Sequence, residues 1–251
     1  SIALLNGLAT VPYGQPVHQG YHLVESIALA ERPGTWHTQP DAGPQHMDWN
    51  PHAVVPRMSS TVVAHERGVE AARWVLERLE GGDLDRRLLL LEWVRLLLER
   101  QPLIEPLGLK DILLRRAADP VAEVANKVTL CLAKAIEADR DFGHQLALRL
   151  HERDETLVCR AMADVLTRLF RRLTWDALPL LDDMLQSDDE GVLAAASATV
   201  GDVKYLDKEQ WADRLRQLVD HPLAIVRRNL VPNLREYIEF DPSDQRGLFH
   251  E

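Results

Sequence analysis

Apolar residues recur every 34 positions from about residue 67 onward, and this period limits the possible folds more than any other feature of the chain. Four columns of equivalent positions hold apolar residues in five successive periods. The columns are Leu79, Leu113, Ala147, Leu181 and Leu215; Leu90, Val124, Val158, Val192 and Val226; Val94, Val128, Met162, Ala196 and Leu230; and Leu98, Leu132, Leu166, Val200 and Leu234. The last three columns are offset by four residues, so they lie on one helix face and predict its buried side.

Each period is long enough for two helices joined by a short turn. The predicted pairs are 68–80 with 84–100, 106–117 with 120–137, 142–152 with 155–172, 176–187 with 189–203, and 208–219 with 222–239. Every turn within a pair contains aspartate, whose carboxylate can accept hydrogen bonds from the free amides that begin the second helix. Pro232 lies inside the last predicted helix, where it removes a hydrogen bond, so we expect a kink or break there.

One such hairpin cannot bury both of its apolar faces, whereas a row of stacked hairpins can. The sequence therefore predicts an all-α protein, a right-handed α-solenoid of about five helix pairs within residues 67–251. A generic helical bundle with an accidental period is the alternative. The persistence of the apolar columns over five periods argues against that alternative.

The turns and the starts of the second helices resemble HEAT repeats, or the shorter HEAT-like repeats, in which an aspartate-containing turn precedes a helix that opens with Val-Arg. The best matches are residues 220–228, Asp-His-Pro-Leu-Ala-Ile-Val-Arg-Arg, and residues 119–124, Asp-Pro-Val-Ala-Glu-Val. The arginine is displaced by one position at Arg160 and is absent after Val192. Tetratricopeptide repeats share the period, but their Trp-Leu-Gly-Tyr pattern is missing. The resemblance covers about residues 67–241 and implies that the second helices line the concave side.

Residues 1–66 differ in composition and predict an irregular segment, rich in proline and histidine, that docks on the solenoid. Only Gln19 to Glu31 predicts a short helix, and Trp36 and Trp49 are the expected anchors. His18 and His22 are four residues apart, which would place both imidazoles on one helix face, and three further histidines follow. They are His37, His46 and His52. Their spacing matches no zinc pattern, so we predict no metal and no cofactor.

The chain begins without methionine, and residues 242–251 align with the opening of a sixth first helix. We therefore expect a piece of a longer protein, truncated in its sixth repeat.

No apolar run approaches the roughly 18 residues of a membrane span, which argues against a membrane partner. The two cysteines, Cys131 and Cys159, lie in apolar helical patterns and are predicted to be buried thiols, which fits a cytoplasmic protein.

The formal net charge is −10, which argues against a general nucleic-acid binder. Residues 176–209 are the most acidic part, with nine acids against two lysines, and this excess could attract a basic partner. The candidate binding residues are arginines of the second helices, which could contact acidic partners or phosphates. They are Arg160, Arg168, Arg171, Arg172, Arg227, Arg228 and Arg235. The alternative is that these arginines only form pairs within a helix, such as Asp164 with Arg168.

The sequence contains no phosphate-binding loop, nucleophile elbow or His-Glu-x-x-His motif, so we predict no enzymatic activity. The resemblance implies a protein-interaction scaffold, a docking or sensor module of a larger protein. The alternative function is a nucleic-acid-binding protein related to the HEAT-like alkylpurine DNA glycosylases. Those proteins use an aromatic-lined basic groove, and Trp93 is the only tryptophan on the predicted second helices.

Overall fold

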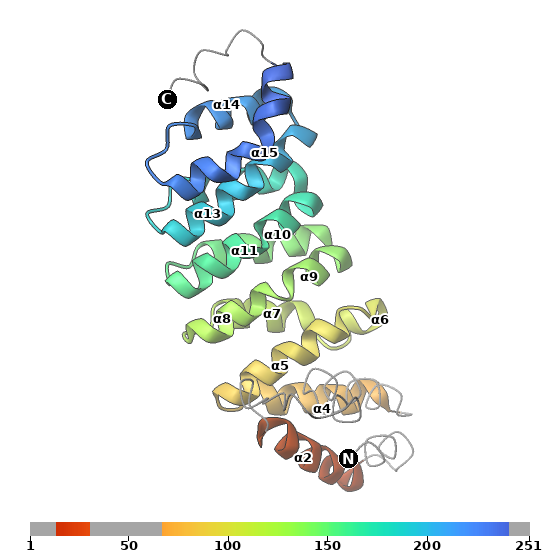
Figure 1. Ribbon diagram of the computed structural model, residues 1–251. Coiled ribbons are helices and arrows are strands. Elements are labelled where there is room, and N and C mark those ends of the chain that lie inside the picture. The colour runs from red at the N-terminus through yellow and green to blue at the C-terminus, as the bar shows by residue number, and fades with distance from the viewer. Residues whose placement is uncertain (1–13, 31–66, 241–251) are drawn as a thin grey trace, which may run out of the picture. The chain divides into compact units, whose positions relative to one another are not determined.

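The computed structural model describes residues 14–30 and 67–240, and within these ranges every regular element is a helix (Figure 1). The chain divides into two compact units, residues 1–116 and 117–251, which are treated separately below. Trp36, Trp49, His37, His46, His52 and the predicted sixth repeat lie outside the described residues. None of the described helices combines the length and the hydropathy that crossing a bilayer requires.

The first unit contains one described helix that precedes the repeats, α2 (Gln15–Ala30), followed by the helices of the first repeats. These are α4 (Gly68–Glu80), α5 (Leu84–Leu97), α6 (Gln101–Ile104) and α7 (Leu109–Ala117), which ends at the unit boundary. Helix α2 confirms the predicted short helix but begins four residues earlier than predicted. Pro16 is compatible with this start because the first turn of a helix has no hydrogen bond that the missing amide could lose.

Helix α2 packs on α4 and α5 through aromatic rings and one buried carboxylate. The Tyr21 side chain is buried and meets the rings of Trp74 and Trp93 edge to face, at centroid distances of 5.3 and 6.2 Å. His18 stacks on Trp74 at 3.9 Å, with 9° between the ring planes. Glu25, which is 2 % exposed, accepts hydrogen bonds from arginines of both α4 and α5. These contacts fix α2 on the first repeat.

The second unit consists of alternating first and second helices. Its elements are α8 (Ala122–Thr129), α9 (Leu132–Ala138), α10 (Arg140–His151), α11 (Thr156–Leu173), the 3-10 helix η2 (Thr174–Ala177), α12 (Leu178–Met184), α13 (Glu190–Thr199), the 3-10 helix η3 (Val200–Tyr205), α14 (Lys208–Leu218) and α15 (Ala224–Phe240). The second helices α8, α11, α13 and α15 pack side by side in that order (Figure 1). The first helices α10, α12 and α14 each pack against the second helix of their own pair.

The apolar columns form the core, as the period predicts. Every member of the four columns is buried except Leu234, which is half-buried near the end of α15. Between neighbouring second helices, a few polar groups join this core. Asn229 donates to the Ala194 carbonyl at 2.8 Å and to the Ser197 hydroxyl at 3.0 Å, and Thr167 and Thr199 share a hydrogen bond at 2.9 Å. Successive repeats are therefore joined by apolar packing and by satisfied polar groups.

The structure corrects two predicted helices. The predicted helix 120–137 is divided into α8 and α9, because Leu130 and Cys131 donate to carbonyls three residues back instead of four. The Thr129 hydroxyl also bonds back to the Asn126 carbonyl, a contact that bends helices. Of the kink or break predicted at Pro232, the break does not occur, since α15 continues through that residue.

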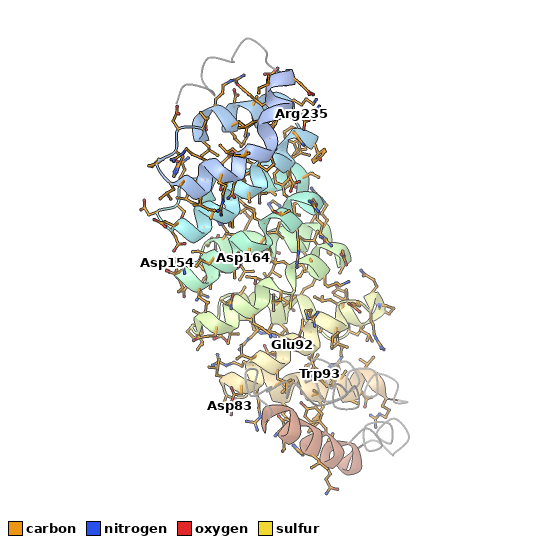
Figure 2. The ribbon with its side chains drawn as sticks, viewed as in Figure 1. Asp83, Glu92, Trp93, Asp154, Asp164 and Arg235 are labelled. Carbon is orange, nitrogen blue, oxygen red and sulfur yellow. The ribbon has the colours of Figure 1, made fainter. Side chains whose placement is uncertain are left out.

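Aspartates cap helices at some of the predicted turns and at two places that were not predicted. Asp83 caps α5, accepting from the Arg86 amide at 3.1 Å, and Asp189 caps α13 (Figure 2 labels Asp83). Before α11 the capping position is Glu155, whose side chain makes no cap bond, because Asp154 lies one residue too early. Asp139 and Asp207 cap the first helices α10 and α14.

Candidate interaction surface

One column of the repeat is exposed in four successive second helices, and it marks the outer face of their layer. The column is Leu130, Asp164, Ala198 and Pro232. With the exposed neighbours of this column on α11 and α15, it forms a surface that we call the helix-B face. The face comprises Leu130, Leu157, Arg160, Asp164, Arg168, Ala198, Arg228, Pro232 and Arg235. Asp164 on α11 and Arg235 on α15 are labelled in Figure 2.

Side-chain size varies across this face. Helix α13 contributes the exposed Ala198, with Ala194 and Ala195 half-buried beside it. The flanking helices α11 and α15 carry long side chains, including exposed apolar ones. Leu157 is 44 % exposed and Val231 is 58 % exposed. Val231 is equivalent to Ser197 and Ala163, which are buried between repeats, so its exposure belongs to the end of the row of repeats and not to the helix-B face.

Five of the seven predicted binding arginines are held by groups within the second unit. Arg160 makes a two-pronged pair with Asp189, the cap of α13, with nitrogen–oxygen distances of 2.9–3.1 Å. Arg172 pairs with a glutamate of α9, and Arg235 pairs with a glutamate one turn further along α15. The remaining contacts are Arg171 with Asp202 at 3.7 Å, and Arg227 with the carbonyls of His221 and Pro222.

Arg168 and Arg228 are different. Both side chains are exposed, and neither guanidinium forms an ion pair with a residue in the described part of the chain. The expected pair between Asp164 and Arg168 is not formed, although the two side chains share a helix face. The structure therefore brings the seven arginines to one layer of helices, and among the described residues only these two guanidinium groups have neither an ion pair nor a hydrogen-bonded carbonyl.

The acidic residues 176–209 serve mainly within the fold. Asp176 pairs with Arg140, Asp182 pairs with Arg214 at 2.7 Å, and Asp183 contacts a histidine of α10. These partners lie 32–36 residues away in sequence, so the pairs connect neighbouring repeats. The acid excess therefore reflects pairing with cations of adjacent repeats more than a separate acidic surface.

Arg153 and Glu155 form another such connection. Arg153 donates to the carbonyls of Ala117 and Asp119 at 2.8 and 2.9 Å and also pairs with the Glu155 carboxylate. Hydrogen bonding from the Arg153 guanidinium holds the pKa of Glu155 at about 2, below its ordinary 4.5. The carboxylate is thus ionised in the folded protein at pH values where it takes up a proton in the unfolded chain.

We expect this pair to make the second unit sensitive to acid. Because the folded pKa is lower than the unfolded one, the stabilisation is complete above about pH 4.5 and is lost as the pH falls towards about 2. Urea unfolding of the wild-type protein and of Glu155→Gln, repeated at several pH values from 7 down to about 2, measures this stabilisation. The stability difference between the two proteins should be largest at pH 7 and shrink on acidification. A difference that stays constant over the whole range would contradict this assignment.

The remaining predicted sites are located as follows. His18 and His22 both lie on α2, as predicted, and His18 is occupied by its stack on Trp74. Within residues 14–30 and 67–240, no three His, Cys, Asp or Glu side chains are grouped as metal ligands.

Both cysteines are free thiols. Cys131 is buried as predicted, but Cys159 is only half-buried because it lies in the first turn of α11. Trp93 is fully buried, so it cannot line a groove.

A search against protein-family models found no match to this chain. A search of curated proteins also found no relative. Among solved structures, an engineered protein aligns over 95 % of this chain and 96 % of its own, with 13 % identity and a TM-score of 0.51. A designed armadillo repeat protein in complex with the peptide (KR)4 aligns over 94 % of this chain and 98 % of its own, also at 13 % identity and 0.51. These likenesses show the fold, an all-α solenoid of helical repeats.

Proposed function

We propose that this protein is a non-catalytic protein-interaction scaffold whose binding surface is the helix-B face. The observation that carries the proposal is the column Leu130, Asp164, Ala198 and Pro232, exposed in four consecutive repeats. Stacked repeats present such a column as a continuous surface, which is how repeat proteins bind extended partners. The peptide complex of the designed armadillo repeat protein supports the same kind of function here.

The finer predictions from the sequence belong to this proposal. The repeats are of the HEAT-like kind, the proline- and histidine-rich segment 1–66 docks on them, and the protein is a docking or sensor module of a larger cytoplasmic protein. The motif at residues 220–228 supports the first of these statements. The packing of α2 on α4 and α5 supports the second, through Tyr21 and Glu25.

The opposite side of the second unit offers less to a partner. Its first helices are connected by ion pairs, such as Asp182 of α12 with Arg214 of α14. A recess of about 630 Å³ at the end of the unit adjoins the helix-B face at Pro232 and Arg235 and is lined mainly by charged residues. Three of these, Arg235, Glu236 and Glu239, are already paired. Paired charges of this kind do not supply a nucleophile or a poised acid, which supports a non-catalytic role.

Site-specific photo-crosslinking tests the proposed surface. A photo-reactive amino acid is placed at Ala198 on the helix-B face, or at Leu148, which is 41 % exposed on the first helix α10. In the native host cells, we expect protein crosslinks from position 198 and few from position 148. Equal crosslinking from both positions, or crosslinking from neither, would overturn the assignment of the surface.

A further inference from the structure

We infer that the helix-B face binds an acidic, extended protein segment that runs across α11, α13 and α15. This inference rests on the proposed function and adds the chemistry of the partner. The net charge of the whole chain is −10, yet the helix-B face contains four arginines and one aspartate. Asp189 and Glu239 neutralise two of these arginines, so the surplus cations of the face are Arg168 and Arg228, with Asp164 opposing them. Charge complementarity at these two arginines selects an acidic partner.

The argument depends most on Arg168 and Arg228, because the other arginines of the face have internal counter-charges. Asp189 neutralises Arg160, and Glu239 faces Arg235 at 3.3 Å. Arg168 and Arg228 are exposed and form no ion pair with a described residue. A guanidinium can hold a carboxylate through two parallel hydrogen bonds, so each can take one acidic side chain without breaking an existing pair.

The helix between these arginines allows a main chain to approach. Arg160, Ala194 and Arg228 occupy equivalent positions in three successive repeats, and Ala198 is the exposed residue one turn further along α13. Alanine side chains end at the β-carbon, so a peptide backbone can lie closer to α13 than to its neighbours. On α11, the exposed Leu157 supplies apolar contact area.

The repeat geometry sets the spacing of the acids. Neighbouring packed helices are about 8–10 Å apart, and the eight-residue offset between the levels of Arg168 and Arg228 adds about 12 Å along the helix axis. The two arginines are therefore about 20 Å apart across α13, which an extended chain covers in about six residues. The Asp164 carboxylate lies between Arg160 and Arg168 on α11, where it repels an acidic partner.

Fluorescence anisotropy with two labelled peptides and a labelled single-stranded oligonucleotide tests the inference. The first peptide has about twelve residues, with two Glu-Glu pairs separated by about six uncharged residues. The second is (KR)4. We expect the wild-type protein to bind the acidic peptide, more weakly as salt rises, and not to bind (KR)4. Arg168→Glu and Arg228→Glu should each weaken binding about tenfold.

Two further variants separate this site from general charge effects. Arg149→Glu reverses a charge that is 54 % exposed on α10, outside the helix-B face, and should leave binding of the acidic peptide unchanged. Asp164→Asn removes the opposing carboxylate and should strengthen binding of the acidic peptide. Circular dichroism checks that each variant is folded.

Several results would overturn the inference. These are unchanged affinity in both arginine variants, an equal loss in Arg149→Glu, preference for (KR)4, no binding of the acidic peptide, or tighter binding of a single-stranded oligonucleotide. The crosslinking experiment distinguishes this failure from failure of the proposed function. If position 198 still crosslinks to protein, the surface assignment stands and only the acidic partner is wrong.

Discussion

Replacing Glu25 with alanine should destabilise the first unit by about 3 kcal/mol, because it removes the shared counter-charge of two arginines. The Glu25 carboxylate is 2 % exposed, and its two oxygens accept from Arg78 of α4 and Arg86 of α5, both at 2.9 Å. Without it, both guanidinium groups lose their partner on α2, although Arg86 keeps its pair with Asp83, and the ring contacts of His18 and Tyr21 remain. The arginines are about one-third exposed, so water compensates in part, which places the effect at the lower end of the range for buried pairs.

Hydrogen exchange and urea unfolding measure this prediction. The α2 amides should lose protection first, and the unfolding transition of the first unit should move to lower urea. Glu25→Gln keeps the size and one acceptor oxygen, so its effect should be intermediate. Glu70→Ala is the matched control, because Glu70 is 47 % exposed and, among the described residues, pairs with Arg67 on the surface, which is worth at most about 1 kcal/mol. Equal effects of Glu25→Ala and Glu70→Ala would refute the role assigned to the buried carboxylate.

The period of the apolar columns was sufficient to predict most of the fold. A column such as Leu90, Val124 and Val158 depends only on which side of a helix is buried, and that is a local property of the sequence. The solenoid then follows because a single hairpin leaves apolar surface in water. The division of the second pair at Leu130 was not predictable in this way, since it depends on a bond from the Thr129 hydroxyl to its own helix.

The candidate site was predictable only in part. Helical spacing placed the arginines on the second helices, but the partners of Arg160, Arg171 and Arg172 lie about one repeat away; Arg160 and Asp189, for example, are 29 residues apart. The rule for pairs within one helix holds for Arg235 with Glu239 but not for Asp164 with Arg168. The distinction between occupied arginines and the two exposed ones, Arg168 and Arg228, requires the packing of one repeat on the next.

Replacing Gly143 with alanine should destabilise the second unit by about 3 kcal/mol, the upper part of the usual range for overpacking. Gly143 is buried on α10, where only Asp139 separates this helix from α9. A β-carbon at this position would lie 2.6 Å from the Cα and 2.7 Å from the backbone nitrogen of Ile136. A backbone atom cannot rotate away as a side chain can, so α9 and α10 would have to separate and expose part of the column around Leu132.

Gly81→Ala is the control for this substitution. Its β-carbon would meet only the Glu77 carbonyl oxygen, at an ordinary 3.6 Å, and its φ of −80° suits any residue. We therefore expect urea unfolding to show a lower midpoint for Gly143→Ala and a nearly unchanged one for Gly81→Ala. Ile136→Ala would remove only the side-chain part of the collision, so adding it to Gly143→Ala should not restore stability. If Gly143→Ala alone were as stable as wild type, α9 and α10 would not be in close backbone contact, and the tight corner at Asp139 would be wrong.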